Sequence, residues 1–308
     1  MIVLDNVIKH IQKRGGITTW WESLLKGLGN SDIITHYYPS KGLRYFPVYK
    51  KADLFMSSYY RVNLYPGCKN ILVVHDVLRE KYFKSTRTLI WRLYIQLMVF
   101  YADRLVFISE HTQNSFWEVY RRPKTIKDIV IHHGFEFPEI DFSTTTRSDN
   151  IIFVGKRGSY KNFLGGLQFI SGKKLVIVGP CLSDEEKFFL DKYQISYREA
   201  GFLDADDLKL LYLDSSFLYW PSLDEGFGLP PIEAIQHGCI PICIDNAINS
   251  EILGEDLLVL NEEWELKAKS VNIGKVRDNL KERFNLDRMI DLFKQLFLDE
   301  TNINNGKL

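Results

Sequence analysis

The sequence predicts an α/β fold made of two Rossmann-like domains, each with a doubly wound parallel sheet. Apolar, strand-like runs alternate with helical patterns along the chain, which is typical of parallel sheets covered by helices. The runs are continuous and rich in β-branched residues, without the polar alternation of a half-exposed strand. The pattern restarts near residue 150, and a length of 308 residues fits two domains.

The first half contains five expected strands and two expected helices. NILVVHD, at residues 70–76, has the composition of a buried parallel strand. Trp20, Trp21, Leu24 and Leu28 are spaced as one face of a helix. The expected strands are 1–6, 53–56, 70–75, 104–109 and 128–134, and the expected helices are 18–28 and 79–102.

The second half repeats this alternation after a polar stretch at residues 141–150, which we interpret as the interdomain linker. We expect domains at 1–145 and 146–284 and a last helical segment at 285–308. The expected strands of this half are 151–155, 174–179, 195–202, 217–222 and 240–245, and the expected helices are 161–170, 183–193, 206–213, 230–237 and 286–298.

Composition favours an ordinary globular protein, with 45% hydrophobic and 25% charged residues. Residues 1–16 lack the basic start and long apolar run of a signal peptide. No apolar run reaches the roughly 18 residues that a membrane span needs, so we expect a cytoplasmic protein. The four cysteines lie in apolar runs without completing a zinc site, and we expect buried free thiols.

Charge is divided unevenly between the halves. Residues 1–148 carry 21 Lys and Arg against 13 Asp and Glu, a net +8, whereas residues 149–308 carry 18 against 26, a net −8. Either the two lobes attract each other, or the basic lobe meets anionic lipid or a phosphate-bearing acceptor. The basic and aromatic stretch at 79–104 leaves a similar choice open, between a packed helix with a basic entry and a membrane-surface patch.

The segment SLDEGFGLPPIEAIQHG, residues 222–238, carries the clearest chemical signal. It follows the apolar run FLYWP, and ligands of open α/β sheets bind beyond the carboxyl ends of strands. Gly226 and Gly228 permit tight backbone conformations beside a ligand. Pro230 or Pro231 suits the first position of a helix, whose free N–H groups and positive dipole end favour a phosphate or another anion.

The acidic groups of this segment have alternative interpretations. Glu233 near a helix start would also serve as a simple partner of the helix dipole. Glu225 and Glu233 would form a glycosidase pair only if the loop brought them within the separation that such enzymes require. His75, at the end of a strand, is either a buried structural histidine or a site residue on the ligand-binding edge of the sheet.

Two further patterns resemble metal sites but have simpler explanations. Asp204-Ala205-Asp206 is a D-x-D that directly precedes a helical pattern, so capping by Asp204 or Asp206 is favoured. His132 and His133 are adjacent in an expected strand and would face opposite sides of the sheet. A dehydrogenase is disfavoured, because no G-x-G-x-x-G follows an early strand.

EGFGLPPIE, at residues 225–233, resembles the E-x7-E signature of the retaining glycosyltransferases of family 4, which have the two-domain GT-B fold. FVGKRGSYKN, at 153–162, is similar to the family's V-G-R-x4-K segment, and HGCIPICID, at 237–245, to its G-x-P-V stretch. In the first half, GGITTW, VVHDV, FISEHTQ and IHHG are similar to the glycine loop and to later strand ends of the family's first domain. The resemblance covers nearly the whole chain and is strongest in 151–260.

The resemblance implies an architecture and a division of labour. The two domains would face each other across a cleft, with the acceptor on the first domain and the nucleotide sugar on the second. The last helix would cross back to pack on the first domain. Members of the family generally work without a metal, so we expect no cofactor beyond the nucleotide-sugar substrate.

The resemblance also implies roles at matching positions. Glu225 would lie against the donor sugar, Glu233 would bond the ribose hydroxyls, and Lys156 and Lys161 would contact the diphosphate. Lys156 stands where the family commonly has Arg, and Arg157 is the alternative for that contact. The expected donor-binding residues are Gly15, Gly16, Lys156, Arg157, Lys161, Phe202, Glu225, Gly226, Phe227, Gly228, Leu229 and Glu233, and the expected catalytic residues are His75, Lys161 and Glu225.

The function that the resemblance implies is retaining transfer of a hexosyl group from a nucleotide-diphosphate sugar to a saccharide or lipid-linked saccharide acceptor. Mannose from GDP-mannose, used for a bacterial surface polysaccharide, is the donor we favour. A nucleotide-sugar epimerase of the same fold and a non-catalytic nucleotide-sugar-binding subunit are the alternatives. We expect no nucleic-acid partner, and peripheral contact with the anionic inner face of the cell membrane is a further hypothesis.

Overall fold

The computed structural model describes residues 1–12, 15–29, 31–140, 147–256 and 258–301. Contacts divide the chain into two compact units, Met1–Glu136 with Phe284–Leu308 (unit 1) and Phe137–Arg283 (unit 2). The predicted domain boundaries, after residues 145 and 284, stay a prediction. Of the predicted linker, residues 141–146 lie outside the described part of the chain, and 148–150 belong to a strand.

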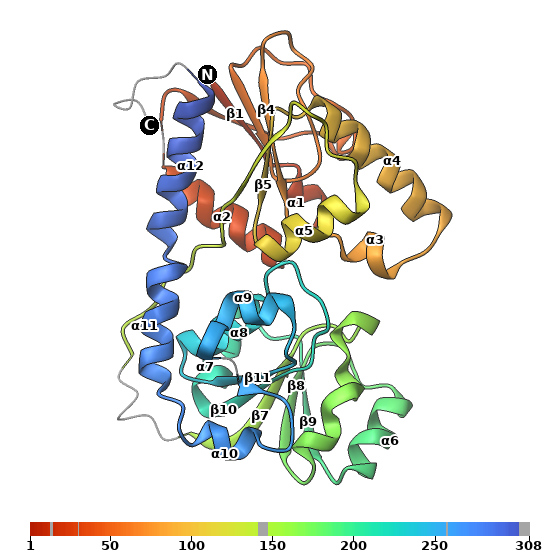
Figure 1. Cartoon of the computed structure of the whole chain (residues 1–308), viewed down its shortest axis with the longest axis vertical. Helices are drawn as coiled ribbons and strands as arrows, with labels where there is room; N and C mark the ends of the chain where they lie inside the picture. The colour runs from red at the N-terminus through yellow and green to blue at the C-terminus, as the bar shows by residue number, and fades with distance from the viewer. Residues whose placement is uncertain (13–14, 30, 141–146, 257, 302–308) are drawn as a thin grey trace. The chain divides into compact units, whose positions relative to one another are not determined.

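Unit 1 is built on a six-stranded parallel sheet in the order β2-β1-β3-β4-β5-β6. Figure 1 shows α2 and α12 on one side of this sheet and α4 and α5 on the other, so the predicted α/β class is confirmed. The elements are β1 (Ile2–Asp5), α1 (Ile8–Ile11), α2 (Gly16–Leu28), β2 (Ile34–Tyr37), η1 (Lys41–Leu43), β3 (Leu54–Ser57), β4 (Lys69–Val74), α3 (Leu78–Tyr82), α4 (Thr86–Tyr101), β5 (Arg104–Phe107), α5 (Glu110–Val119), β6 (Lys127–Val130) and α12 (Leu286–Glu300).

Unit 1 differs from the sequence prediction in several elements. Helices α1 and α5 were not predicted. The single helix expected at 79–102 is two helices, because the hydroxyl of Ser85 accepts a hydrogen bond from the amide of Thr88 and caps a new helix there. Strand β2 was not predicted: its four residues are all half-buried, and ITHY has no continuous apolar run.

Unit 2 contains a second six-stranded parallel sheet, in the order β12-β11-β10-β7-β8-β9. All five strands predicted for this half are present. The elements are β7 (Ser148–Val154), η2 (Ser159–Lys161), η3 (Phe163–Ile170), β8 (Lys174–Val178), α6 (Asp184–Lys192), β9 (Ser196–Gly201), α7 (Ala205–Asp214), β10 (Ser215–Trp220), α8 (Leu229–Gln236), β11 (Ile240–Cys243), α9 (Ala247–Leu253), η4 (Gly254–Asp256), β12 (Leu258–Val259), α10 (Trp264–Ala268) and α11 (Ile273–Arg283).

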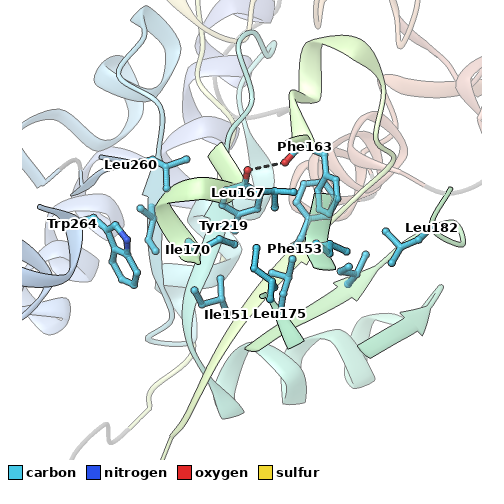
Figure 2. Close-up of a cluster of buried hydrophobic side chains, with 14 of the residues drawn as sticks. Ile151, Phe153, Phe163, Leu167, Ile170, Leu175, Leu182, Tyr219, Leu260 and Trp264 are labelled. Carbon is cyan, nitrogen blue, oxygen red and sulfur yellow. Dashed lines mark hydrogen bonds between the residues drawn. The ribbon is translucent and has the colours of Figure 1, made fainter. Parts of the chain in front are cut away.

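The helix expected at 161–170 is instead formed by two 3-10 segments, η2 and η3. Two consecutive glycines, Gly165 and Gly166, disfavour an α-helix here. Tyr219 of β10 fixes this segment: its hydroxyl donates to the carbonyl of Phe163 at 2.7 Å and accepts from the amide of Gly166 at 3.1 Å. Figure 2 shows this contact within the apolar core of unit 2. The segment next to Lys161 is therefore tied to the strand that precedes Glu225.

The core that surrounds Tyr219 packs alternate residues of neighbouring unit 2 strands, which lie on one face of the sheet, against η3 and α10. Ile151, Phe153 and Leu175 come from central strands, and Trp264 closes the cluster from α10. Fully burying a side chain of this size contributes about 1.5–3 kcal/mol. The cluster thus gives the loops above the sheet a rigid base.

The last helix, α12, packs against α2 within unit 1, as predicted. The approach is close, because a Cβ on Gly27 would lie 1.9 Å from Cδ1 of Ile290. Met289 of the same helix accepts hydrogen bonds through its sulfur from the indole of Trp20 at 3.2 Å and from the amide of Gly134 at 3.1 Å. The helix therefore supports the residues behind His75.

Burial tests the prediction for the cysteines. Cys68, Cys239 and Cys243 are buried free thiols, but Cys181 is exposed, because it lies in the loop that follows β8. Among the described residues, no helix is long and apolar enough to cross a membrane.

Candidate functional site

The candidate residues of unit 2 meet where the order of the parallel strands reverses. Strands β8 and β9 are added on one side of β7, and β10, β11 and β12 are added on its other side, so the order reverses between β7 and β10. The loop after β7 carries Lys161, and the loop after β10 carries Glu225. Ligands of open α/β sheets bind at such a reversal, beyond the carboxyl ends of the strands.

Lys161 and Glu225 form an ion pair at this point. The ammonium of Lys161 lies 2.5 Å from Oε1 of Glu225, and the hydroxyl of Ser222 donates to the same oxygen at 2.6 Å. The two charged side chains are 13% and 10% exposed, so the pair is shielded but open to a ligand. Ser222 was not among the predicted site residues; its position directly after a buried strand was the available signal.

Trp220, the last residue of β10, forms the floor beneath this pair. The Lys161 ammonium lies 4.3 Å from the centroid of its ring, within the range of a cation–π contact. The indole N–H is buried and has no hydrogen-bond partner among the described residues. A Cβ on Gly228 of the following loop would lie 4.0 Å from this nitrogen.

The loop between Glu225 and α8 turns on Gly228, whose φ of +88° is a left-handed conformation that disfavours other residues. Helix α8 begins at Leu229, so the prediction that Pro230 or Pro231 is its first residue is wrong. Because both prolines lack an N–H, the first turn of the helix offers fewer donors than we expected.

Glu233 has partners of its own on the inner side of α8. The hydroxyl of Tyr212 donates to its carboxylate at 3.4 Å, and Tyr212 stacks on His237 with an interplanar angle of 10°. Burial raises the pKa of Glu233, and the Tyr212 hydrogen bond partly offsets this. This carboxylate is therefore a well-positioned hydrogen-bond acceptor rather than a member of the Lys161 pair.

The structure separates the two basic candidates that follow β7. Arg157 is held by Glu186 at 2.6 Å and by the carbonyls of Pro180 and Cys181 at 2.7 Å each. Of its guanidinium nitrogens, Nη1 alone has no hydrogen-bond partner among the described residues. Lys156 is exposed on the same loop. Of these two residues, Lys156 is the one whose side chain can move toward an anion.

The remaining unit 2 candidates lie farther along the same edge. Phe202 follows β9, the outermost strand, and is 76% exposed. Asp204 caps α7, with its carboxylate accepting from the amide of Asp207 at 2.9 Å, so the predicted capping role is confirmed. No group of three or more His, Cys, Asp or Glu side chains within the described ranges is arranged to hold a metal ion.

In unit 1, Gly16 is the first residue of α2. Gly15 is the residue before the helix and has φ of +138°, and a Cβ there would lie 1.7 Å from Nε2 of Gln12. Only glycine fits this position without a shift of Gln12. The start of α2 is thus a turn at the carboxyl side of β1, where the resemblance places the glycine loop.

His75 lies at the carboxyl end of β4 and is 5% exposed. Its ring centroid is 4.8 Å from that of Trp20 and 6.1 Å from that of His133. Neither ring nitrogen of His75 has a hydrogen-bond partner among the described residues. Burial lowers the pKa of His75 to about 3 and that of His133 far below its usual value, so both rings are neutral at physiological pH.

A small pocket opens beside His75 within unit 1. Its walls combine aromatic rings with charged groups, which is a typical surface for a sugar: Ile17, Tyr59, Tyr60, His75, Asp76, Arg79, Glu80 and Trp91 line it. A larger cavity of about 510 Å³, beside Lys173, Lys174 and Trp264, lies at the amino ends of β7 and β8. That is the edge opposite to the ligand-binding edge of an open sheet, so we do not assign it to the candidate site.

Residues 146–273 match the family described as Glycosyl transferases group 1. The chain is 38% identical over 232 residues to the O-antigen chain mannosyltransferase RfbU of Salmonella typhimurium. That match covers 70% of this chain and 63% of RfbU, so the chain spans less than two thirds of this relative.

Solved structures of similar architecture cover almost the whole chain. HepE of Anabaena, in complex with UDP and glucose, has a TM-score of 0.69 at 14% identity and covers 97% of this chain and 100% of its own. AviGT4, a glycosyltransferase involved in avilamycin A biosynthesis, has a TM-score of 0.65 at 13% identity and covers 96% of each chain. At these identities the likeness establishes the fold, which is the predicted GT-B fold.

Proposed function

We propose that this chain, whose residues 146–273 match the group 1 glycosyltransferases, transfers a hexosyl group from a nucleotide-diphosphate sugar to a saccharide or lipid-linked saccharide. The observation that carries the proposal is the Lys161–Glu225 pair at the strand reversal of unit 2. It places a cation and a carboxylate at the edge where an α/β sheet takes its ligand.

Lys161 and Lys156 are proposed to hold the diphosphate. Negative charge develops on this leaving group as the bond to the sugar breaks, and a fixed ammonium in a shielded site stabilises that charge. The diphosphate competes with Glu225 for the Lys161 ammonium. Donor binding therefore frees the Glu225 carboxylate to accept hydrogen bonds from the sugar, while Ser222 keeps it in position.

Glu233 is proposed to accept from the ribose hydroxyls, and the loop amides from Gly226 to Leu229 to donate to the donor's sugar or phosphate. Exposed Phe202 offers a flat apolar surface at the same sheet edge. No metal is assigned a role. In unit 1, the neutral ring of His75 and the turn at Gly15 and Gly16 are proposed to serve the reacting sugar and the acceptor side.

Mannose is the sugar we propose, with GDP-mannose as donor, transfer with retention, and an O-antigen-type polysaccharide as product. The support is the mannosyltransferase named among the relatives, which is 38% identical. HepE was solved with UDP and glucose, so a uridine donor is the main competing possibility. A cytoplasmic location for the reaction stays a prediction from the sequence.

The first experiment is a thermal-shift screen of nucleotide sugars, in which a ligand at 100 times its Kd adds about 2.7 kcal/mol of stability. GDP-mannose should give the largest shift, and Lys161→Ala should remove most of it. Lys174→Ala, an exposed lysine at the opposite edge of the same sheet, is the matched control. A larger shift with another nucleotide sugar would overturn the proposed donor, and equal shifts in both variants would overturn the site.

A further inference from the structure

Helix α4 is apolar on two opposite faces. Ile95, Met98 and Val99 are buried against the core of unit 1. On the other face, apolar side chains three and four residues apart point to solvent, and Ile90 and Leu93 are 63% and 65% exposed. The exposed row consists of Leu89, Ile90, Leu93, Leu97, Phe100 and Tyr101. A helix that ends in solvent would ordinarily be polar on this face.

The exposed row is flanked by positive charge. From Lys81 to Ala102 the sequence contains four basic residues and no Asp or Glu. Lys84, Arg87 and Arg92 are exposed and have no carboxylate partner among the described residues. Arg121 lies beside the helix, since its amide and carbonyl both hydrogen-bond to the side chain of Gln96, at 2.8 and 3.0 Å.

We propose that the outer face of α4 docks unit 1 on an anionic lipid bilayer. An amphipathic helix lies in the plane of a membrane with its apolar row among the acyl chains and its basic flanks at the headgroups. Each Lys or Arg near the surface of an anionic leaflet adds to the binding. Unit 1 also has 23 Lys and Arg against 15 Asp and Glu, so its long-range field has the same sign as the helix.

The positive flank favours a bilayer over a second copy of the chain. Two copies joined through this face would bring the basic flanks of both helices together without acidic partners on α4 itself, and like charges in contact repel. An anionic headgroup layer supplies the opposite charge along the whole helix. Figure 1 shows α4 at the outer edge of unit 1.

The position of α4 deepens the proposed function, on which this step depends. Trp91 of α4 also lines the small pocket beside His75. A docked helix would hold that pocket within about one helix diameter, roughly 10 Å, of the headgroups. A sugar attached to a membrane lipid is presented at that level. The inference therefore selects a lipid-linked saccharide over a soluble one as the acceptor.

Co-sedimentation with vesicles tests the docking. The full chain should bind vesicles of phosphatidylcholine with an equal part of phosphatidylglycerol and leave vesicles of phosphatidylcholine alone in solution. Arg87→Gln should lower the partition coefficient about fivefold. The double change Leu93→Gln with Leu97→Gln should lower it at least tenfold, as an estimate from the apolar area withdrawn from lipid.

Matched controls come from unit 2, where α7 exposes Lys209 and Leu210. Lys209→Gln and Leu210→Gln should leave the partition coefficient unchanged. Equal binding of the α4 variants and the native chain would overturn the proposal, as would equal binding to neutral vesicles. Sedimentation velocity without lipid tests whether a second copy of the chain covers this face instead. A native dimer that dissociates after the Leu93 and Leu97 changes, together with no vesicle binding, would assign the face to a second copy.

The same variants separate docking from catalysis. Transfer to a soluble saccharide, and the donor thermal shift, should survive the α4 changes, whereas transfer to the acceptor in anionic vesicles should fall with the partition coefficient. Vesicle binding without any sugar transfer by the native chain would overturn the proposed function and leave the docking intact.

Discussion

Unit 1 and unit 2 each contain a six-stranded parallel sheet. The two sheets differ in strand order, and the ion pairs at the points where the order reverses differ in their exposure to solvent. In unit 2 the order reverses between β7 and β10, with three strands on each side. In unit 1 it reverses between β1 and β3, with two strands on one side and four on the other. In each unit an ion pair lies at or next to the reversal. Asp5 with Arg61 occupies it in unit 1, and Lys161 with Glu225 in unit 2.

Access to solvent distinguishes these two pairs. The Arg61 and Asp5 side chains are 2% and 0% exposed, and Nη1 of Arg61 lies 2.9 and 3.0 Å from the two carboxylate oxygens. Burial raises the pKa of Asp5 to about 6, against the lowering effect of Arg61. The Lys161 pair remains open to a ligand. Equivalent positions in two similar sheets therefore serve structure in one unit and, as proposed, binding in the other.

The surfaces differ as well. Of the large apolar side chains that are exposed in the described parts of the chain, fifteen belong to unit 1 and five to unit 2. Unit 2 has 16 Lys and Arg against 24 Asp and Glu, the reverse of unit 1. This asymmetry is why we assign the contact with an apolar, anionic partner to unit 1.

The largest expected effect on stability comes from breaking the buried Asp5–Arg61 pair. Arg61→Met leaves the Asp5 carboxylate buried without its cation, and losing one member of a buried pair costs about 3–5 kcal/mol. Lys161→Met, at the Lys161–Glu225 pair, should cost less, because the hydroxyl of Ser222 still donates to Glu225. Urea unfolding followed by fluorescence measures both changes. Equal losses would show that solvent access does not distinguish the pairs.

For the Lys161–Glu225 pair, the main effect of a substitution should be a slower rate of sugar transfer. Lys161→Met removes a cation from the developing charge, and loss of one such group slows the reaction roughly 10²–10³-fold. Initial rates of sugar transfer at saturating donor give the result. Lys174→Met is the matched control and should retain the native rate. A slow Lys174 variant, or a fast Lys161 variant, would contradict the assignment.

Glu233 and Glu225 should separate in binding of the free nucleoside diphosphate. Glu233→Ala removes the proposed ribose acceptor and should weaken binding by about 1.5–3 kcal/mol, the usual contribution of a hydrogen bond to a charged group. Glu225→Ala should lower turnover and leave nucleotide affinity nearly unchanged. Calorimetry with the nucleotide alone decides, and the reverse pattern would exchange the two roles.

The stability of unit 1 is expected to depend on pH. His75 and His133 have folded-state pKa values below the usual 6.5, so the unfolded chain binds protons first and stability is lost as the pH falls below 6.5. Between pH 8 and 6, two such groups lower the free energy of unfolding by about 1.7 kcal/mol. Asp5, with its pKa near 6, acts in the opposite direction mainly below that window. Urea midpoints at pH 8 and 6 test this, and His75→Phe should remove about half of the difference.

The smallest effect concerns the D-x-D of unit 2. Asp204→Ala removes a helix cap and should cost about 1 kcal/mol of stability. The transfer rate should not change, and it should survive EDTA. Activity that is lost in EDTA and restored by Mn²⁺, together with a slow Asp204 variant, would assign this motif to a metal instead.

The continuously apolar strand NILVVHD was predicted, whereas Ile34–Tyr37, which is half-buried and has no continuous apolar run, was missed. The break in the 79–102 helix had a visible signal, since Ser85 lies three residues before Thr88 in a helix-capping arrangement. The apolar residues on either side of Ser85 favoured the interpretation as one continuous helix. A capping residue can therefore end one helix and begin another even where the apolar pattern continues on both sides.

The sequence motifs predicted which residues belong to the site, but not which of these residues contact one another. The meeting of Lys161 with Glu225 depends on β7 lying beside β10, and 64 residues separate the two along the chain. Arg157 and Lys156 are adjacent in sequence, and nothing local indicates that Glu186 and two carbonyls hold the arginine. The position of the prolines in α8 likewise depends on where Gly228 ends the loop.

Product identity tests the central claim most directly. GDP-mannose and a lipid-linked saccharide acceptor are incubated with the native chain, and the products are followed by NMR and by release of GDP. We predict one GDP for each sugar transferred, a new glycosidic bond that keeps the donor's anomeric configuration, and almost no product with Lys161→Met. A sugar whose configuration changes while it stays attached to the diphosphate would identify an epimerase. Tight donor binding with neither product would identify a non-catalytic binding subunit, and either result would contradict the account.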